Sequence, residues 1–110
     1  MTDSALREPT FLILTALAAG AQHGYGIMTD VAEISAGRVR LRAGSLYAAL
    51  NRLVVEGLVE FDREEIVDGR LRRYYRLTAP GAQRLAAEVD RLSRTTAAAR
   101  QRLKLLKNQA

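Results

Sequence analysis

Histidine and cysteine, which supply many of the nucleophiles, proton carriers and metal ligands of proteins, are almost missing from this sequence. His23 is the only histidine among 110 residues, and there is no cysteine. A zinc site needs several such ligands and a nucleophilic dyad needs a second partner, so neither can be assembled within one chain. We interpret His23, which precedes Gly24, as a turn or backbone contact whose pKa range would permit pH sensitivity.

Three neighbouring carboxylates, Asp62, Glu64 and Glu65, are a second candidate for chemistry. They could serve acid–base catalysis or hold a divalent ion. Strand alternation, however, places Asp62 and Glu64 on one face and Glu65 on the other, so a solvated strand explains them better. The sequence therefore predicts no catalytic residue, no metal ligand, no cofactor and no enzymatic activity.

The basic residues form a stronger pattern. The sequence has 17 lysines and arginines against 12 acidic residues and a formal net charge of +5. Its pI of about 10.2 favours a polyanionic partner such as nucleic acid. Positions 38 to 52 contain no acidic residue and four arginines, which are Arg38, Arg40, Arg42 and Arg52. The alternative to a DNA contact for this run is a solvated basic surface.

Hydrophobic spacing predicts three helices in the first half of the sequence. The first runs over 9–20, a turn follows at 22–24, and the second begins at 25 and ends near 35–37. The third ends at Gly57, and its apolar face consists of Leu46, Leu50 and Leu53.

Beyond the third helix the apolar period changes from 3.6 to 2, which predicts two strands. Asp68-Gly69 between them is typical of a tight hairpin turn, because both turn positions need positive φ. Thr78 can cap a final helix that has Pro80 in its first turn. We expect a mainly α fold with a small β-hairpin, composed of a winged helix-turn-helix DNA-binding domain at 1–78 and a C-terminal dimerisation helix at 79–110, packed as one unit.

The third helix is the natural recognition helix, because a helix fits the major groove while a hairpin reaches the flanking backbone. Its outward face has small residues, Gly44 and Ala48, that leave room for close approach. Asn51 can pair with adenine, and Arg52 with guanine or phosphate. The side chains expected to contact the DNA backbone from this region are Arg42, Ser45 and Tyr47.

The hairpin carries its own cluster of basic residues beside the turn. These candidates for phosphate contact are Arg70, Arg72 and Arg73. The alternative is pairing with the acidic first strand, which is strongest for Arg76. Because Tyr75 alternates toward the core, Tyr74 is the tyrosine free to contact DNA.

The final helix has apolar or small residues at alternating spacings of four and three, which form a heptad seam. These candidate dimerisation residues are Leu85, Val89, Leu92, Thr96, Ala99, Leu103 and Leu106. The alternative is a helix folded back onto its own domain, but its C-terminal half would protrude beyond so small a core. A homodimer would present two recognition helices to half-sites about one helical turn apart on two-fold symmetric DNA.

Several motifs together resemble the PadR family of bacterial transcriptional regulators, and in particular its short subfamily with a single C-terminal helix. They are Gly24-Tyr25-Gly26, Gly44-Ser45-Leu46-Tyr47, Leu50, Arg52-Leu53, Gly57-Leu58-Val59, Arg73-Tyr74-Tyr75-Arg76-Leu77-Thr78 and Gly81. The resemblance covers almost the whole sequence. It implies a winged helix-turn-helix repressor that dimerises through its last helix and binds an inverted-repeat operator. In several members a small, often aromatic, effector releases the DNA.

The resemblance also assigns individual residues. It implies that the recognition helix faces DNA with Ser45, Tyr47, Asn51 and Arg52, that 70–74 form the wing, and that Tyr25 lies near phosphate. The sequence departs from the family at Ala48, where many members have proline. It also contains no tryptophan. Multidrug-responsive members of the family stack flat drugs between tryptophan side chains.

Together these patterns predict a homodimeric transcriptional repressor in the cytoplasm. The start, with Asp3, Arg7 and Glu8, lacks the basic and apolar regions of a signal peptide, and the longest apolar run is too short for a bilayer. The alternative is a winged-helix adaptor that binds a protein and no DNA. Salt-dependent DNA affinity would distinguish the two.

Overall fold

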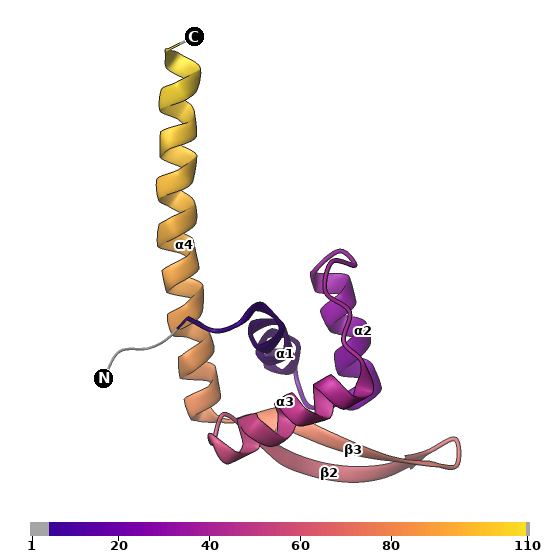
Figure 1. Cartoon of the computed structure of the whole chain (residues 1–110). Coiled ribbons are helices and arrows are strands. Elements are labelled where there is room, and N and C mark those ends of the chain that lie inside the picture. Colours follow the sequence, from indigo (N-terminus) through magenta and orange to yellow (C-terminus); the bar gives the residue numbers. More distant parts are fainter. Residues whose placement is uncertain (1–4, 110) are drawn as a thin grey trace.

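The computed structural model describes residues 5–109, so Asp3 lies outside the described range. In chain order the elements are α1 (Glu8–Ala18), β1 (Gln22–His23), α2 (Gly24–Ile34), α3 (Ala43–Val55), β2 (Val59–Val67), β3 (Arg70–Leu77) and α4 (Ala79–Asn108) (Figure 1). The predicted fold class, mainly α with a small β-hairpin, is confirmed. None of the helices within the described range combines the length and apolar character needed to cross a membrane.

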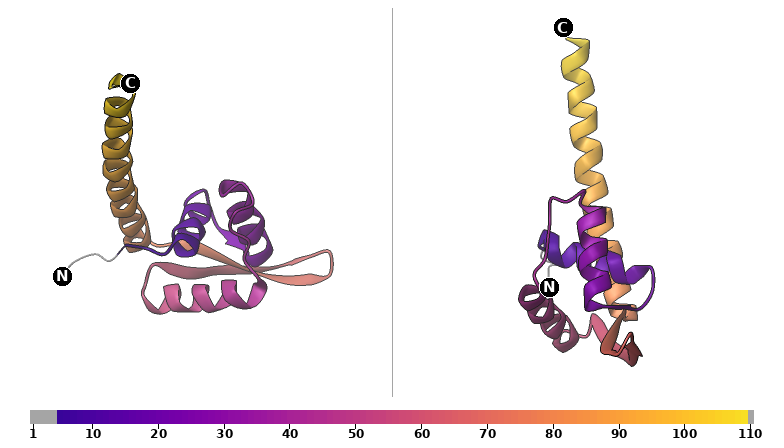
Figure 2. Two further views of the ribbon diagram at one scale, coloured as in Figure 1. Left: turned by 45° about the horizontal axis from the view of Figure 1, so that its top comes forward. Right: turned by 90° about the vertical axis from the view of Figure 1, so that its right-hand side faces the viewer.

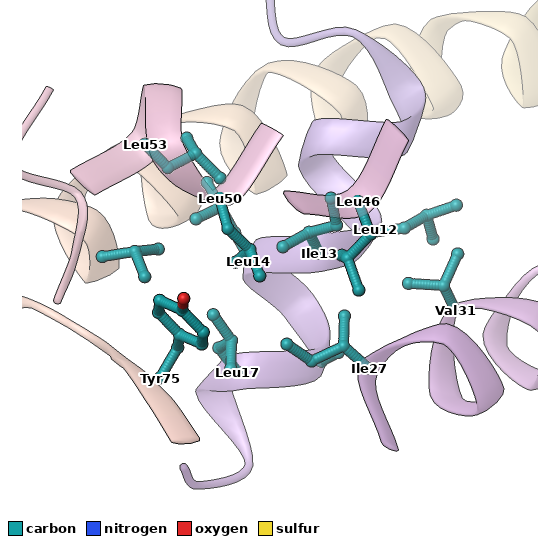
Figure 3. Close-up of a cluster of buried hydrophobic side chains, with 12 residues drawn as sticks. Leu12, Ile13, Leu14, Leu17, Ile27, Val31, Leu46, Leu50, Leu53 and Tyr75 are labelled. Atoms are coloured by element: carbon teal, nitrogen blue, oxygen red, sulfur yellow. The ribbon is translucent and has the colours of Figure 1, made fainter. Parts of the chain in front are cut away.

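The core forms where α1 is enclosed by α2, α3 and the sheet (Figure 3). Ile13 and Leu14 at the centre of α1 have no exposed surface. The three leucines predicted to line the inner face of α3 are at most 1% exposed, and Tyr75 closes the core from the sheet as its alternation predicted. Burying a side chain of this size stabilises a fold by roughly 1.5–3 kcal/mol, so this cluster holds α3 in place.

The sheet has three strands rather than the predicted two. Gln22 and His23, predicted as part of a turn, form β1 and pair antiparallel with Tyr75 and Tyr74 of β3. The strand order is β1-β3-β2. A two-residue strand is too short to show alternation, and its partner lies some fifty positions later, so no local pattern could indicate it.

A β-bulge in β2 overturns the prediction that Asp62 and Glu64 share a face. The register shifts between Phe61 and Arg63, which inserts one extra residue and reverses the alternation beyond it. Asp62 therefore points with Glu60 toward Arg76, whereas Glu64 lies on the opposite face. The hairpin turn itself is as predicted, with φ of 52° at Asp68 and 75° at Gly69.

The junction between the sheet and α4 is tightly packed. Thr78 caps α4, since its Oγ1 accepts a hydrogen bond from the Gly81 N–H at 3.0 Å, and the same hydroxyl donates to the Gly57 carbonyl at 2.6 Å. A side chain at position 81 would collide with the carbonyl oxygen of Leu58. Beyond this junction α4 contacts α1, and its C-terminal half then projects away from the rest of the molecule (Figures 1 and 2).

Candidate nucleic-acid interface

The helix predicted to read DNA, α3, lies on the surface of the molecule. Its outer residues Ser45, Ala48 and Asn51 are exposed, and the backbone at Gly44 is open, since a methyl group there would meet no atom within 4 Å. Figure 2 shows α3 and the hairpin at the end of the molecule away from the C-terminus. The outer face of α3 is therefore accessible to a partner as large as a DNA duplex.

Two of the four arginines around α3 have partners inside the molecule. Arg38 forms a bidentate ion pair with Glu8 at the start of α1, and this guanidinium holds the pKa of the Glu8 carboxyl below its usual range. Arg52 donates from Nη2 to Thr10 Oγ1 at 2.9 Å. The charge of Arg38, at the start of the basic run, is therefore neutralised by Glu8, which lies thirty positions earlier and could not be identified from the local sequence.

Arg40 and Arg42, between α2 and α3, differ from these two. Within residues 5–109 neither has an ion pair or a side-chain hydrogen bond, and both are exposed. Arg42 immediately precedes α3. Arg42, one of the residues predicted to contact the DNA backbone near α3, is therefore available to bind an external anion.

The two tyrosines of the helix-turn-helix lie differently. Tyr25, in the first turn of α2, is 70% exposed, while Tyr47 of α3 is 40% exposed. The Tyr47 ring packs against Gly24, where an added methyl group would collide with its hydroxyl. This contact explains the glycine before Tyr25, because it lets α3 approach the start of α2.

Most hairpin arginines pair with the acidic strand. Arg76 bridges Glu60 and Asp62, so the cross-strand alternative considered for this residue is correct. Arg73, predicted to contact DNA, lies 3.6 Å from Glu64 and stacks over Phe61. The Arg70 side chain at the tip has no ion pair or hydrogen bond with the rest of the described chain.

His23, Arg72 and Tyr74 form a cluster that sequence reasoning did not assemble. The Gly26 N–H points at His23 Nδ1 from 3.0 Å, at the place of the predicted backbone contact. Nη1 of Arg72 lies 2.5 Å from His23 Nε2. The imidazole meets Tyr74 edge-on at 5.3 Å, and Arg63 lies 4.1 Å above the Tyr74 ring. β1 brings the histidine to Arg72, a residue 49 positions later.

This cluster makes stability depend on pH. Partial burial, and to a smaller extent Arg72, lower the pKa of His23 below its usual 6.5. The unfolded chain therefore takes up the proton first, so the stabilisation is complete above about pH 6.5 and is lost as the pH falls through the lowered folded pKa. We expect urea unfolding at pH 7.5 and 5.5 to show a loss below about 1 kcal/mol, because the ring is partly solvated. A His23→Gln variant should lose less unfolding free energy between these two pH values. An equal loss would show that His23 is not the source of the pH dependence.

The seam predicted on α4 is exposed over most of its length. Val89 and Leu92 are 45% and 37% exposed, and Leu103 and Leu106 are 63% and 66% exposed. Only Leu85, near the start, packs against the core among the seam residues of the described chain. Where α4 crosses α1, an apolar groove lies between the two helices, lined by Phe11, Val89, Leu92 and Thr96 among others.

The order of helices, the hairpin and the exposed α3 define a winged helix-turn-helix fold. Residues 13–87 match the transcriptional regulator PadR-like family. The chain belongs to this family of transcriptional regulators.

Individual relatives agree with this assignment. The sequence is 39% identical over 56 residues, 51% of each chain, to transcriptional regulator Rv3488 of Mycobacterium tuberculosis, so the match spans about half of that curated relative. A PadR family regulator of Clostridium difficile R20291 has a TM-score of 0.75 and 25% identity, covering 88% of this chain and 99% of that one. Bacillus subtilis PadR in complex with operator DNA has a TM-score of 0.66 and 27% identity, covering 76% of this chain and 47% of that one.

Proposed function

We propose that this protein is a homodimeric repressor that binds an inverted-repeat DNA operator. In this proposal α3 enters the major groove and the β2–β3 hairpin contacts flanking phosphates. The observation that carries it is the exposed outer face of α3, with Asn51 at its centre. At its start lies Arg42, which has no ion pair with any residue of the described range. The structural similarity to Bacillus subtilis PadR, which was solved with operator DNA, supports the same docking.

The pairing of charges refines the candidate DNA-contacting residues. In the hairpin, Arg70 is exposed and unpaired within residues 5–109, and Arg72 is held by a neutral imidazole rather than a carboxylate. These two are the principal phosphate contacts that we propose there, with Tyr74 beside them. Arg73 would first have to leave Glu64.

The α4 seam supports the dimer. Four large apolar side chains at heptad spacing would remain exposed in a monomer, and a second copy is the partner that a two-fold operator requires. We retain the division into a DNA-binding domain at 1–78 and a dimerisation helix at 79–110. A small aromatic effector remains a prediction, as does a cytoplasmic location.

The test is selection of genomic DNA fragments by the purified protein at two salt concentrations. A repressor that neutralises several phosphates should enrich an inverted repeat and lose affinity steeply as salt rises. Repression is then tested by placing the enriched sequence upstream of a reporter gene. Absence of DNA binding at both salt concentrations would favour the adaptor.

Asn51→Ala is expected to relax base preference at one position of each half-site. An asparagine that pairs with adenine contributes about 1–3 kcal/mol of discrimination, while affinity for unrelated DNA should hardly change. Titration against single-base variants of the selected operator measures this. Asn108→Ala, the same change at the far end of α4, is the control, and an unaltered preference at every base would remove Asn51 from the interface.

Gly44→Ala should separate folding from DNA binding. The added methyl group meets open space in the free protein, so we expect unchanged stability or a gain of up to about 0.5–1 kcal/mol from helix propensity. Against DNA the same methyl group would push α3 outward, and an overlap of this kind lowers affinity about tenfold. Thermal unfolding and operator titration of one preparation test both effects. Full operator affinity would show that the backbone at Gly44 does not approach DNA closely.

A further inference from the structure

We propose that His23 is a positioning residue. Its neutral imidazole has one acceptor lone pair, and two donors compete for it: Arg72 of the hairpin and the Gly26 N–H in the first turn of α2. Through this ring, engagement of Arg72 by a DNA phosphate would strengthen the cap of α2. The DNA-linked step depends on the proposed function; the sharing itself is a property of the free protein.

The geometry creates a competition. The Gly26 N–H points at Nδ1 from 3.0 Å, and Arg72 Nη1 lies 2.5 Å from Nε2. Both groups are donors, because a guanidinium and a backbone amide carry no acceptor on nitrogen. A neutral imidazole has one acceptor nitrogen and one N–H, so it can satisfy only one of them at a time.

The ring is held where both donors can reach it. The backbone pairing of His23 with Tyr74 fixes its position beside β3, and the Tyr74 ring packs edge-on against it. At Gly26 an added methyl group would lie 3.4 Å from the imidazole Cε1 and would collide with the Gln22 side-chain oxygen. Arg72 and Tyr74 from β3 and the Gly26 amide from α2 thus all lie against the ring.

In the free protein we expect Arg72, rather than the Gly26 N–H, to donate the hydrogen bond to the imidazole lone pair. A hydrogen bond from a charged donor is roughly twice as strong as a neutral one, and the Arg72 contact is the shorter of the two. The ring proton then resides on Nδ1, and the Gly26 N–H is left without its side-chain acceptor.

Binding to DNA reverses this preference. A phosphate oxygen is a stronger acceptor for a guanidinium than an imidazole nitrogen, because it is ionised. When Arg72 turns to phosphate, solvent exchange moves the ring proton from Nδ1 to Nε2 without net uptake or release. Nδ1 then accepts from Gly26, which stabilises the turn of α2 that contains Tyr25.

The experiment is nitrogen-15 NMR of the imidazole at pH 8, where the ring is neutral. His23 is the only histidine, so its two ring nitrogens are identified without ambiguity. We expect the proton on Nδ1 in the free wild type and on Nε2 in Arg72→Met, with amide exchange at Gly26 slowed about fivefold in that variant. Arg102→Met, the same change at an exposed position of α4 far from the hairpin, is the control and should match the wild type in both the ring tautomer and the Gly26 exchange rate.

Each result decides a separate step. The same tautomer in the wild type and Arg72→Met would overturn the shared lone pair, whether or not the protein binds DNA. Addition of the selected operator to the wild type should move the proton to Nε2. A bound complex that keeps it on Nδ1 would overturn the DNA-linked step, whereas failure to bind any DNA would instead overturn the proposed function.

Discussion

Replacing Leu103 with aspartate is expected to convert the protein to monomers and to weaken operator binding by about a hundredfold or more, since a second linked half-site commonly adds that much affinity. Leu103 is 63% exposed in the isolated chain, so the change should leave the monomer folded. In a dimer the new carboxylate would be buried against the apolar seam of the partner helix without a counter-charge. Leu92→Asp should act in the same way.

Sedimentation at several concentrations measures the assembly, and titration of a full operator and of a half-site measures the DNA affinity. Leu105→Asp is the matched control, because Leu105 is 53% exposed on the same helix but lies off the seam. We expect its dimer to survive. A dimer that persists in both Leu92→Asp and Leu103→Asp would refute the heptad interface.

Gly81→Ala is expected to destabilise the fold by about 3 kcal/mol, at the upper end of the cost of overpacking a closed site. The added methyl group would overlap the carbonyl oxygen of Leu58 and lie 2.9 Å from Leu77 Cδ1. The Leu58 oxygen cannot easily retreat, because it accepts the Thr78 N–H at 3.1 Å. The clash outweighs the roughly 1 kcal/mol that alanine gains over glycine in a helix.

Urea unfolding at one fixed protein concentration tests this, because the proposed dimerisation would make stability depend on concentration. Gly44→Ala is the control, since it adds the same atoms where no neighbour lies within 4 Å. If Gly81→Ala were as stable as the wild type, the junction between β2 and α4 would have to be looser than described.

The features that local patterns encode were predictable. The buried face of α3 follows from leucines at helical spacing, and each of them is at most 1% exposed. The hairpin turn follows from Asp68-Gly69, because few other pairs accept two positive φ values. The cap of α4 by Thr78 was also predicted and is present.

Three of the features that were missed depend on residues far apart in sequence. The β1 strand needs β3, the Arg38 contact needs Glu8, and the His23 cluster needs Arg72; no short window contains both partners. The bulge at Asp62 is a different failure, because alternation alone carries no sign of one inserted residue. The sequence indicated Arg70, Arg72 and Arg73 together as candidate phosphate contacts. It could not show that Arg73 is paired with Glu64, because that contact depends on the register of the hairpin. The assignment of individual residues to DNA and to the dimer stays a prediction.

In the proposed dimer, the fixed junction at Gly81 makes the spacing of the operator half-sites depend on the length of α4. An α-helix turns by about 100° and advances about 1.5 Å per residue, so deleting one residue between the junction and the seam would rotate each DNA-binding domain relative to its partner. DNA turns only about 34–36° per base pair, so a change of one base pair in operator spacing would not restore the original phase. Relatives that read half-sites at other separations should therefore differ in this stretch of α4 even where α3 is unchanged.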